Sequence, residues 1–70
     1  MRLMVDVTGG GRDISRIVLQ ESASGVFLYF YGPKEGFPCI GEEWYESREA
    51  ALDACRRRFD VPEEAWRPAD

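Results

Sequence analysis

The chain contains no histidine, and this absence removes the side chain that proteins use most often as a general base and as a metal ligand. Its two cysteines, Cys39 and Cys55, are too few for the disulfide framework of a small secreted domain. No segment approaches the ~20 apolar residues of a membrane span, and residues 1–6 lack an apolar stretch of signal-peptide length. We therefore expect a cytoplasmic protein with reduced thiols, no metal, no cofactor and no membrane partner.

Motifs for catalysis and phosphate binding are also missing. The glycine run at residues 9–11 lacks the lysine and hydroxyl of a phosphate-binding loop, so we interpret it as a hairpin loop. Neither cysteine has a base beside it in the sequence. We expect Cys55 to be buried on a helix stripe and Cys39, in a loop, to be the more reactive thiol. The sequence therefore predicts no catalytic residue, and the protein is not expected to be an enzyme.

The composition is typical of one globular domain that spans residues 1–70. Hydrophobic residues make up 44% of the chain and charged residues 31%, and no repeat or low-complexity tract is visible. A domain of this size buries only about 60% of the surface of its unfolded chain, so association can contribute to its stability. The net charge of -4 repels phosphate backbones and therefore disfavours nucleic acid as a partner.

The most informative segment is residues 25–32, where six consecutive apolar or aromatic residues stand between two glycines. A strand without a polar side is typically buried on both faces. One helix can cover only one face of a small sheet. The second face of this strand must therefore find another partner.

Alternating apolar residues and turn signals predict three antiparallel strands, at residues 2–8, 14–21 and 26–31. The prolines and glycines that follow predict a loop over residues 32–43. Ser47 is a good N-cap for a helix over residues 48–59.

The apolar positions of this helix form one stripe, and Trp44 or Tyr45 can cap its amino end. Pro62 then opens a short turn, and we expect Trp66 to fold back onto the core. The predicted fold is α+β, a β-β-β-α chain in which one helix packs on one face of a three-stranded antiparallel sheet.

The alternation within the third strand separates its side chains into two sets. Val26, Leu28 and Phe30 match an aliphatic face of the other strands and should meet the helix. The opposite set should form an outer surface of five residues, Phe27, Tyr29, Tyr31, Met4 and Val18. A contiguous patch of this kind is rare on monomers.

Three interpretations of this outer surface remain open. The loop with Phe37 and Ile40, or the tail with Trp66, can cover it. Alternatively it binds a protein partner or a second copy, since tyrosine and phenylalanine combine contact area with a polar handle. It can also stack the bases of a single-stranded nucleic acid. The basic cluster Arg56–Arg58 gives little support to this third interpretation, because acidic residues accompany it and arginines complement a helix carboxyl terminus.

Residues 41–51, with the motifs Gly41-Glu42-Glu43-Trp44 and Ser47-Arg48-Glu49-Ala50, resemble a pattern in small uncharacterised bacterial single-domain proteins. In that pattern a glycine-acid-x-tryptophan turn leads into a Ser-x-x-Ala helix, and a closing tryptophan such as Trp66 follows. The resemblance implies a turn, an N-cap and a helix stripe, and it implies no catalytic residue.

Taken together, these observations predict a small soluble interaction or accessory module that self-associates or binds a protein through the outer face of its sheet. The alternative is a single-stranded nucleic-acid binder that stacks bases on the same aromatic residues.

Overall fold

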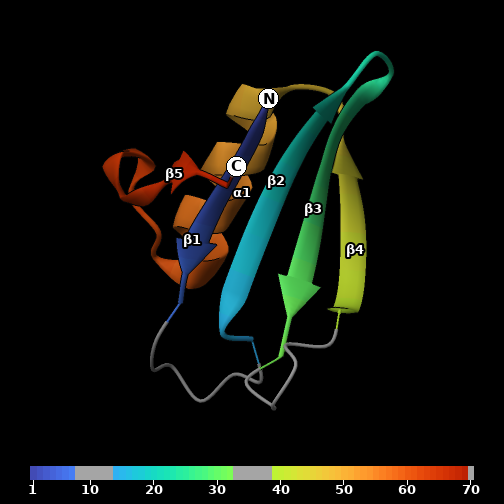
Figure 1. Ribbon diagram of the computed structural model, residues 1–70. Helices are drawn as coiled ribbons and strands as arrows, with labels where there is room; N and C mark the ends of the chain where they lie inside the picture. Colours follow the sequence, from blue (N-terminus) through green and yellow to red (C-terminus); the bar gives the residue numbers. More distant parts are fainter. Residues whose placement is uncertain (8–13, 33–38, 70) are drawn as a thin grey trace.

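The computed structural model describes residues 1–7, 14–32 and 39–69, which form a five-stranded sheet with a helix on one side (Figure 1). In chain order the elements are β1 (Arg2–Asp6), β2 (Arg16–Ser22), β3 (Gly25–Tyr31), β4 (Cys39–Tyr45), α1 (Arg48–Phe59), the 3₁₀ turn η1 (Glu63–Ala65) and β5 (Arg67–Pro68). The strand order is β4-β3-β2-β1-β5, and all neighbouring strands are antiparallel. The α+β class with an antiparallel sheet and a packed helix is therefore confirmed.

The three expected strands are present, with bounds that differ by one or two residues. A two-residue turn joins β2 to β3, since Ser22 pairs with Gly25. The Ser22 hydroxyl accepts a hydrogen bond from the Ser24 amide at 3.3 Å and donates one to the Gly25 carbonyl at 3.0 Å. Gly25 has a φ of 141°, which favours glycine. The expected loop at residues 9–11 lies outside the described residues.

The expectation of a three-stranded sheet is wrong, because two further strands extend it at its edges. Residues 39–45, which were expected to lie largely in a loop, form β4 beside β3. The register shifts by one residue after the pair Phe30–Gly41, which leaves Ile40 as an extra residue. Within β4 the loop signal came from Gly41, which lies beside this bulge, a position where strands often contain glycine. Residues 33–38 of the expected loop lie outside the described part of the chain.

The helix has the bounds that the sequence predicts. The Ser47 hydroxyl accepts a hydrogen bond from the Ala50 amide at 3.1 Å, which satisfies one free donor of the first turn. The helix ends where Asp60 takes a left-handed conformation, with φ 57° and ψ 40°. Within the described ranges, no helix is long and apolar enough to cross a membrane.

The core lies between α1 and one face of the sheet. Three large side chains, Ile17, Leu19 and Leu28, are fully buried, and burial of each contributes about 1.5–3 kcal/mol. The helix contributes small residues to the same cluster, including Ala51 and Cys55. The prediction that the aliphatic side of β3 meets the helix is confirmed.

The carboxyl-terminal segment packs against this core from the helix side. The expected turn after Pro62 is present as η1, and Trp66 packs against the buried cluster. The Trp66 Nε1 atom is buried and has no hydrogen-bond partner in the described residues. Beyond it, β5 pairs Arg67 with Met4 and Pro68 with Leu3. The tail therefore lies on the core side and at the sheet edge.

Candidate interaction surface

One face of the sheet carries α1, and we call the opposite face the outer face. No helix or strand of the described ranges covers the outer face (Figure 1). Side chains alternate along a strand, and residues paired across strands share a face. The register therefore assigns the outer-face residues to three rows that cross the sheet.

The middle row runs across all five strands as Glu42, Tyr29, Val18, Met4 and Arg67. Val18 lies in the middle of the row and is only 6% exposed, between the larger Tyr29 and Met4. The row therefore has an apolar centre with a carboxylate at the β4 edge and a guanidinium at the β5 edge. The side chain of Glu42 makes no hydrogen bond or ion pair within the described residues.

A second row contains the aromatic part of the outer face. It pairs Trp44 with Phe27, Phe27 with Gln20, and Gln20 with Arg2. The rings of Phe27 and Tyr29 stack, with centroids 6.2 Å apart and planes inclined by 18°. Trp44 is 53% exposed, and its indole lies over Gly25. The stacked pair Phe27–Tyr29 and the exposed indole of Trp44 therefore lie on the same face, over β3 and β4.

The third row contains Tyr31, Arg16 and Asp6 and is largely charged. Asp6 accepts hydrogen bonds from Arg16 at 2.9 Å and from Arg67 at 2.8 Å, so one carboxylate joins β1, β2 and β5. These two arginines lower the pKa of Asp6 below its usual range. Asp6 therefore stays ionised, and it holds two of the cations of the outer face in place.

Charge is distributed unevenly between the two sides of the sheet. The rows of the outer face contain three arginines and two carboxylates, a local net charge of +1. The other described residues contain four arginines and eight carboxylates. The net negative charge of the chain therefore resides mostly away from the outer face.

A separate polar cluster lies on the core side, where α1 meets β4. Glu43 accepts hydrogen bonds from Arg58 at 2.5 Å and from the Tyr45 hydroxyl at 2.8 Å. Arg58 lowers the pKa of Glu43, while burial raises the pKa of Tyr45. The Arg58 guanidinium also lies over the rings of Phe30 and Phe59. These contacts attach the helix to β4, and each polar group in them has a partner.

Both cysteines are free, as predicted, with Cys39 exposed and Cys55 buried. Burial raises the pKa of the Cys55 thiol to about 12, so this thiol remains protonated and unreactive. Within the described ranges, no three histidine, cysteine or carboxylate side chains are grouped so that they could hold a metal ion.

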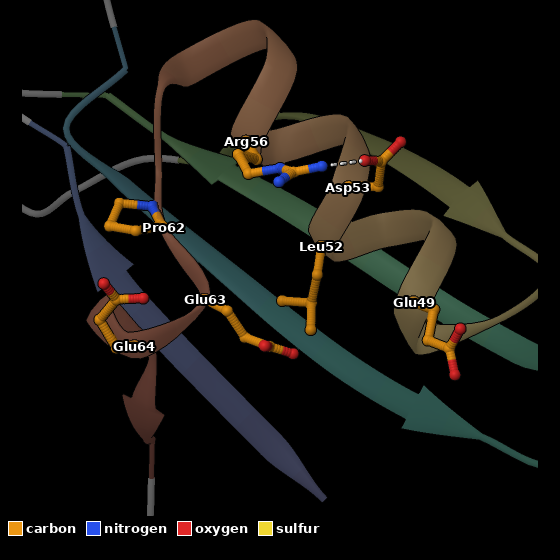
Figure 2. A pocket seen from close by; sticks show the side chains of 7 residues that line it. All are labelled: Glu49, Leu52, Asp53, Arg56, Pro62, Glu63 and Glu64. Carbon is orange, nitrogen blue, oxygen red and sulfur yellow. Dashed lines mark hydrogen bonds and ion pairs between the residues drawn. The ribbon is translucent and has the colours of Figure 1, made fainter.

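A groove of about 510 Å³ lies between α1 and η1. Figure 2 shows Leu52 at its centre and the carboxylates of Glu49, Glu63 and Glu64 around it. Arg56 and Asp53 form an ion pair of 2.9 Å along its helix side. The groove is open and acidic, and Arg56 is its only cation among the described lining residues.

The structure places all five predicted surface residues, Phe27, Tyr29, Tyr31, Met4 and Val18, on the outer face. Sequence reasoning missed Trp44 and Glu42, since β4 was expected to be a loop and Trp44 was considered a helix contact. Tyr45 is the residue that packs against the core. The alternation of Gly41, Glu43 and Tyr45 with Glu42 and Trp44 was the signal for this strand.

Comparisons with protein-family models, with curated proteins and with solved structures found no match to this chain.

Proposed function

We propose that this protein is a small interaction module that binds another protein chain through the outer face of its sheet. The observation that supports this most is the presence of three aromatic side chains, the stacked Phe27 and Tyr29 and the half-exposed Trp44, on a face without cover from any described element. Phe27 and Tyr29 are partly buried in the monomer and Trp44 is 53% exposed, so a partner would bury the remaining apolar area at about 25 cal/mol per Å². Tyrosine and tryptophan are also enriched in protein interfaces.

The proposal assigns no reaction to the chain. The polar cluster of Glu43, Tyr45 and Arg58 is internally paired, and the Cys55 thiol is buried with a raised pKa. The charged groups of the outer face surround its apolar centre, which is the arrangement of a hydrophobic core with a polar rim.

The test combines Tyr29→Ser with Tyr31→Ser in the full chain. Loss of these cross-strand pairs should lower the free energy of unfolding by roughly 0.5–2 kcal/mol, so the variant should remain folded by circular dichroism. Its self-association in sedimentation, or its binding to an identified protein partner, should be lost. A folded double variant that keeps every association of the parent would contradict the proposal.

Tyr45→Ser is the matched control, since Tyr45 packs against the core and bonds to Glu43. This change should lower the free energy of unfolding more than either outer-face change does. A protein that retains its association after Tyr45→Ser but loses it after the two outer-face changes would separate binding from folding.

Binding of single-stranded nucleic acid is a second candidate, favoured by the three arginines that share the outer face with the aromatic rings. We favour a protein partner, because Asp6 already engages Arg16 and Arg67 and because Glu42 lies beside Tyr29. Fluorescence anisotropy with labelled single-stranded oligonucleotides in low salt distinguishes the two. Tight binding that is lost on Tyr29→Ser would favour the nucleic-acid function.

A further inference from the structure

The outer face has charges of opposite sign at its two edges. A face with this charge pattern is complementary to a second copy of itself that is turned so that its edges are exchanged. Glu42 lies at the β4 end of the middle row and Arg67 at the β5 end, with Val18 at the centre. We propose that the outer face binds a second copy of this chain, related by a two-fold axis that runs parallel to the strands above β2. This inference rests on the proposed function and specifies the partner.

A two-fold axis in this direction keeps the position along the strands and exchanges the two edges of the sheet. β4 then faces β5 of the partner, β3 faces its β1, and the two copies of β2 face each other. Glu42 consequently faces Arg67 of the partner subunit, and Tyr29 faces Met4 of the partner subunit. By symmetry each of these contacts occurs twice, as an isologous interface requires. At both edges the carboxylate of Glu42 meets the guanidinium of Arg67, which also binds Asp6 of its own protomer at 2.8 Å and shares that carboxylate with Arg16. On either side of the axis a thioether meets an aromatic ring.

The aromatic row fits the same arrangement. Phe27 faces Arg2 of the partner subunit, and a guanidinium over an aromatic face is a favourable contact. The Arg2 side chain makes no hydrogen bond or ion pair within the described ranges, so it is available for this role. Arg16 lies near the axis opposite its own copy, and the ion pair of each Arg16 with Asp6 of its own protomer, at 2.9 Å, reduces the repulsion between the two guanidinium groups.

The charges also select this axis over the alternative. A two-fold axis across the strands, centred on the same row, places Glu42 opposite the partner's Glu42 and Arg67 opposite the partner's Arg67. Like charges at short range oppose association. The axis parallel to the strands joins unlike charges at both edges instead, and its one like pair, Arg16 with its copy, has an Asp6 carboxylate beside each guanidinium.

The size and overall charge of the chain agree with such a dimer. Five strands about 4.8 Å apart and roughly 20 Å long give a flat footprint of roughly 400 Å² per protomer. The total of about 800 Å² is below the roughly 1,200 Å² of standard interfaces and in the range of weak, transient contacts. We therefore expect a dimer that dissociates on dilution. Each outer face has a local charge of +1. In a dimer through these faces, the acidic sides of the two protomers therefore point away from each other.

The test uses Glu42→Arg and Arg67→Glu, separately and mixed, with sedimentation equilibrium over a range of concentrations. Each variant alone places two like-charged pairs in its homodimer, and its dimer dissociation constant should rise at least about tenfold. An equimolar mixture restores both unlike pairs in the heterodimer, so dimers should reappear at the parent's concentration. Glu64→Arg, an exposed change on the helix side, is the control and should dimerise like the parent.

The outcomes separate this inference from the proposed function. A parent that stays monomeric at high concentration, or a Glu42→Arg variant that dimerises like the parent, overturns the inference. If that monomer binds a different protein in a manner that requires Tyr29 and Tyr31, the proposed function stands. A dimer that Tyr29→Ser with Tyr31→Ser leaves unchanged uses another surface and contradicts both. Circular dichroism and urea titration of each variant show whether a lost dimer reflects unfolding. This control matters most for Arg67→Glu, because that change also removes the ion pair with Asp6 within the protomer.

Discussion

At the residue scale, the two cysteines show how the position of a thiol in the fold sets its reactivity. Cys55 is fully buried, and its pKa is raised from 9.0 to about 12 by loss of solvation. A rise of this size lowers the thiolate fraction on the order of a thousandfold at neutral pH. Cys39 is exposed at the start of β4, with its thiol 3.6 Å from the Gly41 carbonyl.

We expect an alkylating reagent at pH 8 to modify Cys39 rapidly and Cys55 only when the chain unfolds. Mass spectrometry over time should show one addition in buffer and two in denaturant. The variant Cys39→Ser should show almost no addition in buffer. Equal rates at the two positions in the folded protein would mean that Cys55 is not buried as described.

At the element scale, the strands β4 and β5 mark the limit of what the sequence predicts. The helix bounds followed from Ser47 and the apolar stripe, and the three central strands followed from alternation between turn signals. β4 was predicted as a loop because the prolines and glycines in and before it outweighed a weak alternation of its polar and apolar residues. Its pairing with β3 is a long-range contact, which local sequence patterns do not reveal. β5 has two residues, too few for any periodicity.

The same limit applies to the candidate surface. Phe27, Tyr29 and Tyr31 could be assigned to one face from alternation alone, and Met4 and Val18 from the choice of the helix side. Trp44, Glu42 and Arg67 join them only through strand pairing. The sequence therefore could not predict that charges of opposite sign lie at the two edges of the outer face, because this depends on the order of the strands in the sheet.

Gly25 and Gly41 provide a test of how β4 packs on β3. A Cβ atom on Gly25 would lie 2.7 Å from ring carbons of Trp44, and its φ of 141° disfavours other residues. At Gly41 the nearest atom would be Cδ2 of Phe30, at an ordinary 3.9 Å. Gly25→Ala should lower the free energy of unfolding in urea by about 1–3 kcal/mol, whereas Gly41→Ala should change it by less than about 1 kcal/mol. Similar losses at both glycines would show that Trp44 does not pack over Gly25.

At the scale of the whole molecule, ionisation limits the pH range of stability at both ends. Arginine partners lower the pKa values of Asp6 and Glu43, from 3.8 and 4.5 respectively, so folding favours the ionised carboxylates. Their stabilisation is complete above these ordinary values and is lost as the pH falls through the lower folded values. Burial raises the pKa of Cys55 from 9.0 to about 12, and that of Tyr45 above 10.0, so folding favours their protonated forms. This contribution is complete below pH 9 and is lost as the pH rises toward 12.

The free energy of unfolding, measured by urea titration, should therefore be nearly constant between about pH 5 and pH 8.5 and should fall on either side. Cys55→Ala removes the larger alkaline contribution and should flatten the decline between pH 9 and 12, leaving the part due to Tyr45. The acidic decline should be unchanged by this variant, since Asp6 and Glu43 keep their arginine partners. Cys39→Ala is the matched control and should retain the alkaline decline of the parent. If Cys55→Ala also retains it in full, deprotonation of the buried thiol does not drive alkaline unfolding.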